Sequence, residues 1–431
     1  MVKIMNPEIK QRIEQIRRGE VPNGYKKTKA GILPEDWIVC KIDDCLKRIE
    51  KPVMVQADEQ YTQIGIRSHG KGLFYKEPVS GRSLGNKNVF WVLPNCFVLN
   101  IVFAWEQAIG KTTQAEVGMI GSHRFPMYYP KNDKVDIDYL ISYFLTKRGT
   151  DILDAASPGG AGRNRTLGQD RFIKSVIILP SLAEQQKIAK ILTTQDKVIE
   201  LYEKKIEQLQ LLKKICLKKM FPKEGSSVPE VRFPGFTASW EKCKVTNIAS
   251  DICGGGTPTT TNEAYWNGEI PWIQSSDLID GILFDVKPRK YITKAGLNNS
   301  AAKLIPEKSI AIVTRVGVGK LSYMPFSYTT SQDFLSLCAL RTEPNFSVYV
   351  LYQMLQKELK FVQGTAIKGM TKEDLLSKSI FIPNSKDEQI QIGEYFRSLD
   401  HLITLHQHRL DEEKRKKKAL MQLLLTGIVR V

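Results

Sequence analysis

The 431-residue chain has little that would support a disulfide framework or a structural zinc site. Its seven cysteines are an odd number, they are scattered, and none forms a Cys-x-x-Cys pair. The five histidines supply no Cys-x-x-Cys…His spacing, and His406 and His408 fall on different faces of a helix. We therefore expect seven free thiols, most of them in the core, in a reducing cytoplasm.

Long apolar runs are missing as well. The most apolar stretch, residues 90–105, is broken by Pro94, Asn95 and Asn100, so no segment of about 20 apolar residues is present to span a membrane. The first ten residues lack the apolar core of a secretory signal. We expect a cytoplasmic protein without a membrane partner.

Motifs that carry catalytic chemistry are also missing. Residues 65–71 have phosphate-loop spacing, but Gly72 stands where Ser or Thr should hold magnesium. Gly254–Gly256 does not continue into the Gly-x-Gly-x-x-Gly dinucleotide fingerprint. The chain has no Asn-Pro-Pro-Tyr box to position an amine for methyl transfer, and no Asp…Glu-x-Lys nuclease cluster. The sequence thus predicts no catalytic residue, no metal ligand and no cofactor in this chain.

Charge of one sign dominates what is present. The formal net charge is +17 and the pI is about 9.4. Residues 181–221 and 384–431 together contribute +6, which leaves +11 for the remainder of the chain. This balance favours a polyanion such as nucleic acid as the partner, contacted by the globular spans, although a basic solvated surface remains an alternative.

The chain also contains an internal repeat. Pro180 recurs as Pro383 and Trp37 as Trp240, both shifted by 203 positions, and Glu184-Gln185 recurs as Glu388-Gln389, shifted by 204. The spans from Trp to Pro, 37–180 and 240–383, have equal lengths of 144 residues. A period this long is a duplicated half-molecule and not a solenoid unit. The order is domain, helix, domain, helix.

The two helical runs carry the spacing of a coiled-coil seam, in which apolar positions alternate by three and four. The first seam comprises Ile199, Tyr202, Ile206, Leu209, Lys213, Cys216 and Met220. The second comprises Ile403, His406, Leu410, Glu413, Lys417, Leu420 and Leu424. Both are imperfect, so we expect them to cover each other as an antiparallel pair. The basic tract 414–418 is either a phosphate contact or the solvated face of this pair.

The expected fold is α+β: two globular α/β domains separated by two long helices packed as an antiparallel coiled coil, with a pseudo-two-fold repeat. An amphipathic helix is expected at 7–18, single helices at 137–153 and 348–363, and strands at 89–92, 175–179, 270–273, 310–313 and 334–340. The expected boundaries are 1–30 for the N-terminal helix and basic connector, 31–180 for the first domain, 181–224 for the first spacer, 225–383 for the second domain and 384–431 for the second spacer.

The globular spans hold side chains suited to recognition, since Arg and Lys bind guanine edges or phosphates, and Gln and Asn bind adenine. The candidates in the first span are Arg67, His69, Lys71, Arg124, Arg163, Asn164 and Arg165. The candidates in the second span are Thr257, Gln274, Ser275, Arg315, Lys320, Gln332 and Lys368.

Taken together, these patterns resemble the DNA-specificity subunits of Type I restriction–modification systems. The resemblance rests on the duplicated helix start, on Gly255–Pro258 followed by Tyr265-Trp266 and Ile270–Trp272, and on Arg315–Gly319 and Thr330–Asp333. In the first domain only Gly121–Pro126 is similar, and the Gly-Gly-Thr-Pro segment is absent. The two domains are therefore expected to read different sequences.

The resemblance implies a non-catalytic subunit bound to double-stranded DNA, in which each domain reads one half of a bipartite asymmetric target. It implies two modification subunits that carry S-adenosylmethionine and methylate adenine, and a restriction subunit that uses ATP and Mg²⁺ where one is present. The residues expected to dock these subunits or to form the coiled coil are Glu184, Gln185, Ile188, Leu192, Asp196, Ile199, Tyr202, Ile206, Leu209, Glu388, Gln389, Ile392, Phe396, Asp400, Ile403 and Leu410.

Two other classes of protein stay open at this point. One is a coiled-coil adaptor whose basic charge is incidental. The other is a nuclease or methyltransferase with unrecognised motifs. Binding that weakens steeply with added salt distinguishes DNA recognition from an apolar adaptor.

Overall fold

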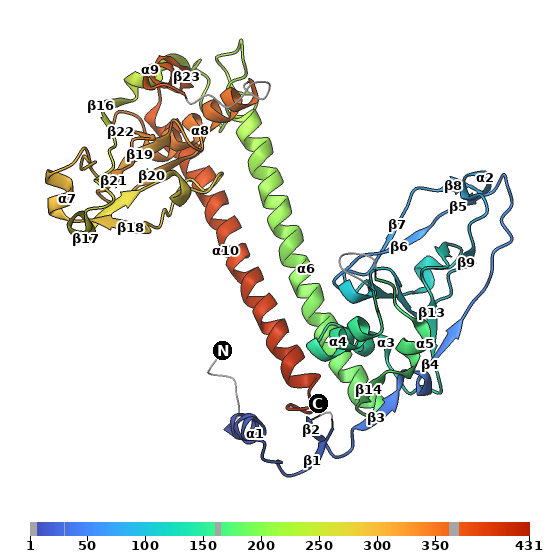
Figure 1. The fold of residues 1–431 in the computed structure, drawn as a ribbon. Helices are drawn as coiled ribbons and strands as arrows, with labels where there is room; N and C mark the ends of the chain where they lie inside the picture. The colour runs from blue at the N-terminus through green and yellow to red at the C-terminus, as the bar shows by residue number, and fades with distance from the viewer. Residues whose placement is uncertain (1–6, 30, 160–164, 362–369) are drawn as a thin grey trace. The chain divides into compact units, whose positions relative to one another are not determined.

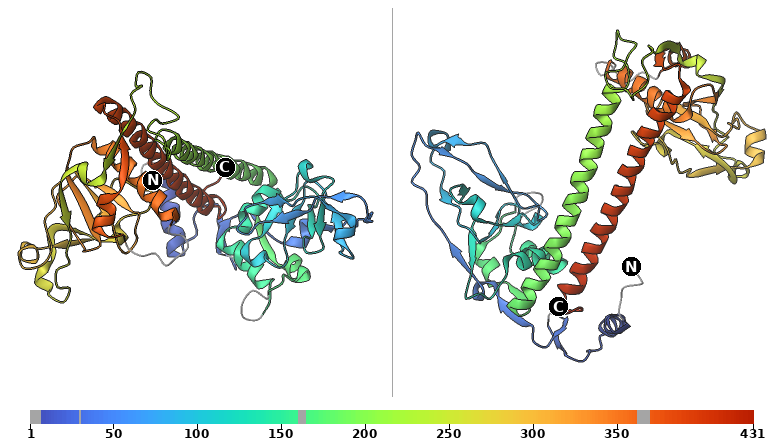
Figure 2. Two further views of the ribbon diagram at one scale, coloured as in Figure 1. Left: turned by 90° about the horizontal axis from the view of Figure 1, so that it is seen from above. Right: turned by 180° about the vertical axis from the view of Figure 1, so that it is seen from behind.

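The computed structural model describes residues 7–29, 31–159, 165–361 and 370–431, which divide into two compact units (Figure 1). Unit 1 comprises the residues up to Leu201 together with Leu410–Val431, and unit 2 comprises Tyr202–Arg409. Two long helices, α6 (Leu182–Lys219) and α10 (Lys386–Leu424), each contribute one end to each unit. Both helices are continuous in all the views of Figures 1 and 2.

Unit 1 begins with the amphipathic helix α1 (Pro7–Arg18), as predicted. The basic connector that follows is not irregular: β1 (Tyr25–Thr28) and β2 (Gly31–Pro34) form an antiparallel hairpin. Lys26 and Lys27 pair with Leu33 and Ile32 in this hairpin, a cross-strand pairing that charge alone did not indicate.

The globular part of unit 1 is built from short strands around a four-stranded sheet, ordered β11-β10-β13-β4. Smaller pairs are β3-β14, β5-β8, β6-β7 and β9-β12. The strands are β3 (Ile38–Lys41), β4 (Leu46–Ile49), β5 (Gln60–Tyr61), β6 (Ile64–Ile66), β7 (Leu73–Tyr75), β8 (Val79–Ser80), β9 (Val89–Trp91), β10 (Phe97–Leu99), β11 (Ile109–Lys111), β12 (Ile120–Ser122), β13 (Met127–Pro130) and β14 (Val176–Leu179). The helices are α2 (Gly81–Leu84), α3 (Ile137–Phe144), α4 (Lys147–Ala155) and α5 (Gln169–Lys174).

The single helix expected at 137–153 is wrong, because the chain breaks it into α3 and α4. Thr146 caps the second helix, its hydroxyl accepting the backbone N–H of Gly149 at 3.2 Å. A Cβ on Gly149 would lie 2.3 Å from the carbonyl oxygen of Tyr143. The glycine therefore permits a close turn that the apolar periodicity did not reveal.

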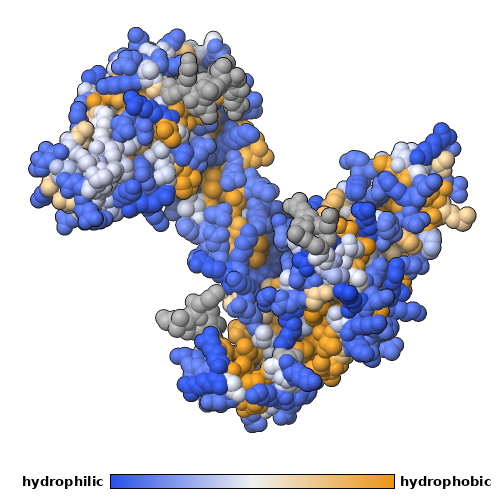
Figure 3. All heavy atoms as spheres, in the orientation of Figure 1, coloured by the Kyte–Doolittle hydropathy of each residue, from blue (hydrophilic) through white to orange (hydrophobic). Residues whose placement is uncertain are grey.

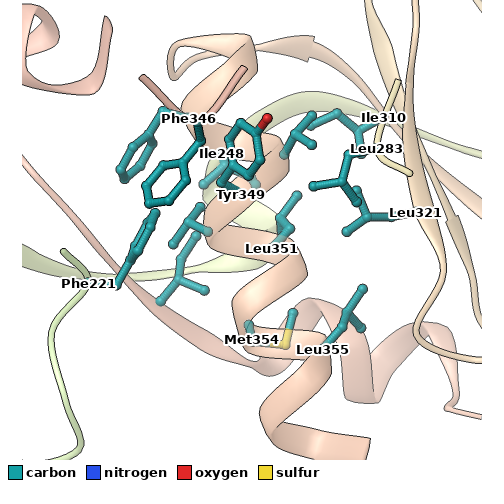
Figure 4. Close-up of a cluster of buried hydrophobic side chains, with 14 of the residues drawn as sticks. Phe221, Ile248, Leu283, Ile310, Leu321, Phe346, Tyr349, Leu351, Met354 and Leu355 are labelled. Atoms are coloured by element: carbon teal, nitrogen blue, oxygen red, sulfur yellow. The ribbon is translucent and has the colours of Figure 1, made fainter. Parts of the chain in front are cut away.

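Unit 2 has a longer four-stranded sheet, ordered β16-β22-β19-β20, beside a three-stranded sheet, β18-β17-β21, and the pair β15-β23. The strands are β15 (Glu241–Lys244), β16 (Ala249–Gly254), β17 (Trp266–Ile273), β18 (Lys290–Ile292), β19 (Ser309–Val313), β20 (Leu321–Met324), β21 (Thr329–Thr330), β22 (Phe334–Leu340) and β23 (Ser379–Ile382). The helices are α7 (Lys294–Asn298), α8 (Pro344–Phe361) and α9 (Lys372–Ser377). Figure 4 shows the core, where α8 side chains such as Tyr349 and Leu351 pack with Phe221, Ile310 and Leu321.

The start and the end of each repeat adopt the same structure. In unit 1, β3 pairs antiparallel with β14, with Ile38 opposite Leu179. In unit 2, β15 pairs with β23, with Glu241 opposite Ile382, so both positions are shifted by 203. The interiors of the repeats differ in strand number and pairing. The two halves therefore share the strand pair that joins the start and the end of each repeat, which we call the frame. They differ in the strands and loops between these ends.

The repeated Glu closes this frame in each unit. Glu184 is buried, and its carboxylate accepts the indole N–H of Trp37 at 3.2 Å and two bonds from Arg430 at 2.6 and 2.8 Å. Glu388 is buried in the same way, bonded to Trp240 at 3.3 Å and to Arg232 at 2.6 and 2.8 Å. A buried carboxylate needs such partners, which explains why Trp and Glu recur together.

The repeated Gln anchors the helix start to the domain. The Gln185 amide donates to the Pro180 carbonyl and accepts the backbone N–H of Asp136, at 3.0 and 2.9 Å. The Gln389 amide donates to the Pro383 carbonyl and accepts the N–H of Glu343, both at 2.9 Å. Each amide therefore joins the strand end, the long helix and a domain helix.

The two seams contact each other in antiparallel order within each unit. In unit 1, Lys417 contacts Asp196 at 2.5 Å, and Gln195 donates to Glu413 at 2.5 Å. In unit 2, Lys213 contacts Asp400 at 2.5 Å, and the Tyr202 ring lies 5.8 Å from the His406 ring. Lys213 and Lys417 are repeat equivalents, as are Asp196 and Asp400. The charged interruptions of each seam thus bind carboxylates of the other helix.

The surface of the units is mostly hydrophilic on the face drawn in Figure 3, and the thiols are free. Hydrophilic residues cover most of each unit on the face shown in Figure 3. Among the described residues, no helix combines the length and apolarity needed to cross a membrane. All seven cysteines are free, as predicted. Cys45, Cys96 and Cys338 are buried, and the other four are half-buried and pack against the core clusters, in line with the expectation.

The anchoring role of Gln185 gives a first prediction. Gln185→Leu should leave the buried carbonyl of Pro180 and the half-buried backbone N–H of Asp136 without these partners, at a cost of up to about 1–3 kcal/mol each. We expect the thermal midpoint of unit 1 to fall by several degrees and the Asp136 amide to exchange faster with solvent. The matched control is Gln186→Leu, because Gln186 is the adjacent, exposed glutamine. Equal midpoints for the two variants would contradict the assigned role.

Candidate nucleic-acid interface

Four loops of unit 2 meet at one end of its sheets. They are residues 255–262 after β16, 274–277 after β17, 314–320 between β19 and β20, and 331–333 between β21 and β22. Each is bonded to at least one of the others, and we call the set the loop ring. The loop-to-loop bonds are Thr257 Oγ1 to Gln332 Oε1 (2.7 Å), Thr314 N to Asp333 O (2.8 Å) and Lys320 Nζ to Ser275 O (3.4 Å). A further bond runs from Ser331 N to Ile273 O (3.0 Å).

Two glycines allow loop 255–262 to pack closely against its neighbours. A Cβ on Gly255 would lie 2.0 Å from Thr330 Oγ1, and one on Gly256 would lie 2.1 Å from the Ala301 carbonyl oxygen. The Trp272 indole donates to the Gly256 carbonyl at 3.2 Å, and the Trp266 indole donates to the Thr259 carbonyl at 3.2 Å. The Gly-Gly-Thr-Pro segment is therefore a fixed platform.

The structure gathers six of the seven sequence candidates of the second domain on the loop ring. Arg315 and Gln332 are exposed, and Thr257, Gln274, Ser275 and Lys320 are half-buried. The Thr257 hydroxyl fixes the Gln332 amide oxygen and leaves its NH₂ group on the exposed side. Lys368, the seventh, lies outside the described residues.

Unit 1 gathers its candidates around a different loop, residues 100–107. His69 and Gly70 donate backbone bonds to Glu106 and Gln107 at 2.8 and 2.9 Å. Ile101 of the same loop accepts the N–H of Leu167 at 2.8 Å and donates to the Arg124 carbonyl at 3.0 Å. The candidate segments around residues 67–71, 124 and 165 thus share one neighbour.

These unit 1 side chains differ in how free they are to meet a ligand. Arg67, His69, Lys71 and Arg124 are exposed. Arg165 instead holds the fold: it pairs with Asp154 at 2.7 Å, donates to Ser157 O at 3.1 Å and lies 5.4 Å from the Trp105 ring centre. Arg163 and Asn164 lie outside the described residues.

Sequence reasoning missed the central element of each arrangement. Loop 100–107 overlaps the apolar stretch 90–105, whose composition does not mark a loop, and it includes a left-handed residue, Gln107, with a φ of 53°. In unit 2, the ammonium group of Lys290 lies 5.8 and 5.6 Å from the Trp266 and Trp272 ring centres. No local pattern around Lys290 marks this position.

Most of the residues expected to dock partners or to form the coiled coil are buried or paired within the chain itself. Glu184, Gln185, Ile188, Leu192, Ile206, Leu209, Glu388, Gln389, Ile392, Phe396 and Leu410 are buried. Asp400, Ile199, Tyr202 and Ile403 are half-buried, and Asp196 is exposed but paired with Lys417. The basic tract 414–418 also has carboxylate partners, since Lys416 contacts Glu413 at 3.2 Å.

Apolar side chains left exposed on the helices lie at other positions. In unit 2 they are Leu211, Leu212 and Ile215 on α6, and Leu402 and Leu405 on α10. They fall outside the seam, which is why the seam pattern did not identify them. We call these five residues the outer apolar set.

Comparison with known proteins gives one consistent result. The family model described as "Type I restriction modification DNA specificity domain" matches the chain twice, at residues 34–211 and 238–414. A putative type I restriction enzyme MjaX specificity subunit from Methanocaldococcus jannaschii is 26% identical over 432 residues, covering 94% of this chain and 97% of that protein. The MjaVIII specificity subunit from the same organism is 25% identical and covers 94% of this chain and 96% of its own.

Solved structures agree at the level of fold. A Type I restriction-modification S subunit from M. genitalium has a TM-score of 0.57 at 11% identity, covering 94% of this chain and 97% of its own. A chain from a structure of a type I R-M system has a TM-score of 0.53 at 17% identity, covering 92% and 99%. The two matches to the family model each include one Trp…Pro frame and the start of the long helix that follows it. The chain belongs to the Type I restriction modification DNA specificity family and carries that family's domain twice.

Proposed function

We propose that this chain is the DNA-binding specificity subunit of a Type I restriction–modification complex, and that each domain reads one half of a bipartite, asymmetric target. The observation that supports this proposal is that the two domains share a frame but present different loops. The two frames match in strand register and in the Glu and Gln contacts. The loops that the frames present have different residues and different connections.

The exposed side chains of the loop ring suit direct readout of base edges. Gln332 can donate from its NH₂ group and accept at its amide oxygen, the pattern that complements adenine. Because Thr257 holds that oxygen at 2.7 Å, the amide is oriented before DNA arrives. Arg315 is exposed on the adjacent loop and supplies donors for guanine or phosphate.

Unit 1 would read its half-site with a different set. Arg67, His69, Lys71 and Arg124 are exposed around loop 100–107, and the two arginines and the lysine carry positive charge without a Gly-Gly-Thr-Pro platform. Arg165 is assigned to support instead of readout, because Asp154 and Ser157 already occupy its guanidinium group. A target whose two halves differ follows from this difference.

The helices α6 and α10 are proposed to form an antiparallel coiled coil that sets the separation of the two half-sites. Support comes from the seam residues, none of which is exposed, and from the equivalent contacts Asp196–Lys417 and Asp400–Lys213. Since these contacts lie at corresponding places in the repeat, a helix pair with pseudo-two-fold symmetry accounts for both.

The chain itself is proposed to be non-catalytic and to bind no cofactor. Adenine methylation would be supplied by two docked modification subunits with S-adenosylmethionine, and cleavage by a restriction subunit with ATP and Mg²⁺. The outer apolar set offers these subunits a surface, because five large apolar side chains on helices are exposed in unit 2.

The proposal is tested by exchanging one of the two domains. Residues 240–383 are replaced by the corresponding span of another family member, and the chimera is co-expressed with its modification subunit. We expect one half of the methylated sequence to change and the other to stay, because the frame ends at the same strand pair in both domains. Sequencing of methylated adenines measures this. Exchange of 37–180 is the matched control and should alter the other half; a change in both halves from a single exchange would refute independent reading.

The spacer role predicts a defined change of length. Removing one heptad from each helix, residues 203–209 and 403–409, keeps the pairs Asp196–Lys417 and Lys213–Asp400 and shortens the helix pair by about 10 Å. We expect the distance between the methylated half-sites to fall by about three base pairs. Removing 203–209 alone is the control, since it breaks the register and should abolish methylation. An unchanged spacer in the double deletion would contradict the assignment.

Polar substitutions in the outer apolar set should weaken binding of the modification subunit and leave DNA binding unchanged. The double variant Leu212→Glu with Ile215→Glu should weaken association with the modification subunit by about tenfold or more, because two apolar side chains would no longer be buried. Gln210→Glu, at an exposed position on the same helix, is the control and should associate normally. Analytical ultracentrifugation gives the affinity for the subunit, and fluorescence anisotropy gives the affinity for DNA. Equal affinities for the subunit would exclude this surface.

A further inference from the structure

A cluster of two thiols and a carboxylate lies on one face of the four-stranded sheet in unit 2. Asp251 and Cys253 are two residues apart on β16, so their side chains share a face. Cys338 on β22 stands directly opposite Asp251 in the antiparallel register. The ligand atoms of these three residues all lie within 4.8 Å of one another.

The burial of the cluster is graded from the core outward. Cys338 is 1% exposed, Cys253 is half-buried and Asp251 is exposed. The Cys253 Sγ lies 3.6 Å from Asp251 Oδ2, and Asp251 Oδ1 accepts the backbone N–H of Ile252 at 2.8 Å. Because β16 is the edge strand of its sheet, solvent reaches the carboxylate side. An ion could enter there and find the thiols behind it.

The donor set indicates which ion would fit. Thiolates are soft ligands that bind zinc-like cations, whereas Mg²⁺ and Ca²⁺ require mostly oxygen ligands. Zinc with three protein ligands keeps a fourth position for water. We propose that Asp251, Cys253 and Cys338 form a three-ligand site for a thiophilic divalent cation such as Zn²⁺ or Cd²⁺, with the fourth position open to solvent.

The surroundings are compatible with this chemistry. Burial raises the pKa of the Cys338 thiol to about 12 and also raises the pKa of Cys253. Both thiols therefore keep their protons in the free protein and release them when a metal ion binds. No local sequence pattern marks the site, because Cys253 and Cys338 are 85 positions apart and only the strand register brings them together.

The test is a titration of the reduced full-length chain with Cd²⁺ and with Co²⁺. The thiolate-to-metal charge-transfer absorption is measured at each addition. We expect one equivalent of metal per chain, with an affinity that does not depend on protein concentration, and a rise in the thermal midpoint of the wild type. Cys253→Ser should abolish the absorption band, and Asp251→Asn should weaken binding by about tenfold or more.

The control is Cys243→Ser, because Cys243 is another half-buried thiol of unit 2, on the separate strand pair β15-β23. This variant should bind metal as the wild type does. Cys253 is only half-buried, so Cys253→Ser should keep the metal-free thermal midpoint, which separates loss of the site from loss of the fold. An absorption band of equal size in Cys253→Ser, or one that grows with protein concentration, would overturn the proposal, since other thiols would then account for the binding.

Discussion

The structure depends on a buried carboxylate at the start of each long helix. Glu184 and Glu388 each bind a tryptophan indole and an arginine guanidinium in nearly the same geometry. An unpaired charge in such a position would be strongly destabilising, so the Glu, the Trp and the Arg must be present together. Through this contact the first strand of a domain, its last strand and its helix are held as one frame.

The source of the arginine differs between the two frames. Arg232 comes from the segment that links α6 to the second domain, whereas Arg430 comes from the segment after α10. Arg430 also contacts Asp36, and its guanidinium holds the pKa of that carboxyl below its ordinary value. The arginine partner of the buried glutamate therefore comes from the C-terminal segment in unit 1 and from the linker in unit 2.

A fixed frame leaves the loops free to differ. In unit 2 the loop ring is fixed by two glycines with no room for a Cβ and by two tryptophan indoles. In unit 1 the corresponding place is organised by loop 100–107 and by Arg165 above Trp105. Family membership is carried by the frame, and specificity would be carried by these loops. The proposed metal site lies on β16, next to the ring but outside it.

The sequence alone predicted the repeat, the spacing of the seam and the helix starts, because these depend on periodic spacing and on pairs of residues with obligatory partners. It predicted the N-terminal helix and β22 at their observed bounds. It did not show the break at Thr146 or the pairing of Lys26 and Lys27 in a strand, since a local helix cap and a short hairpin set these and apolar spacing does not mark them. It did not show the support role of Arg165 either, which depends on contacts with Asp154 and with Trp105, 60 positions away. The exposure of the candidates and the proximity of the thiols could be seen only in the folded chain, because strand register brings together side chains that no local pattern connects.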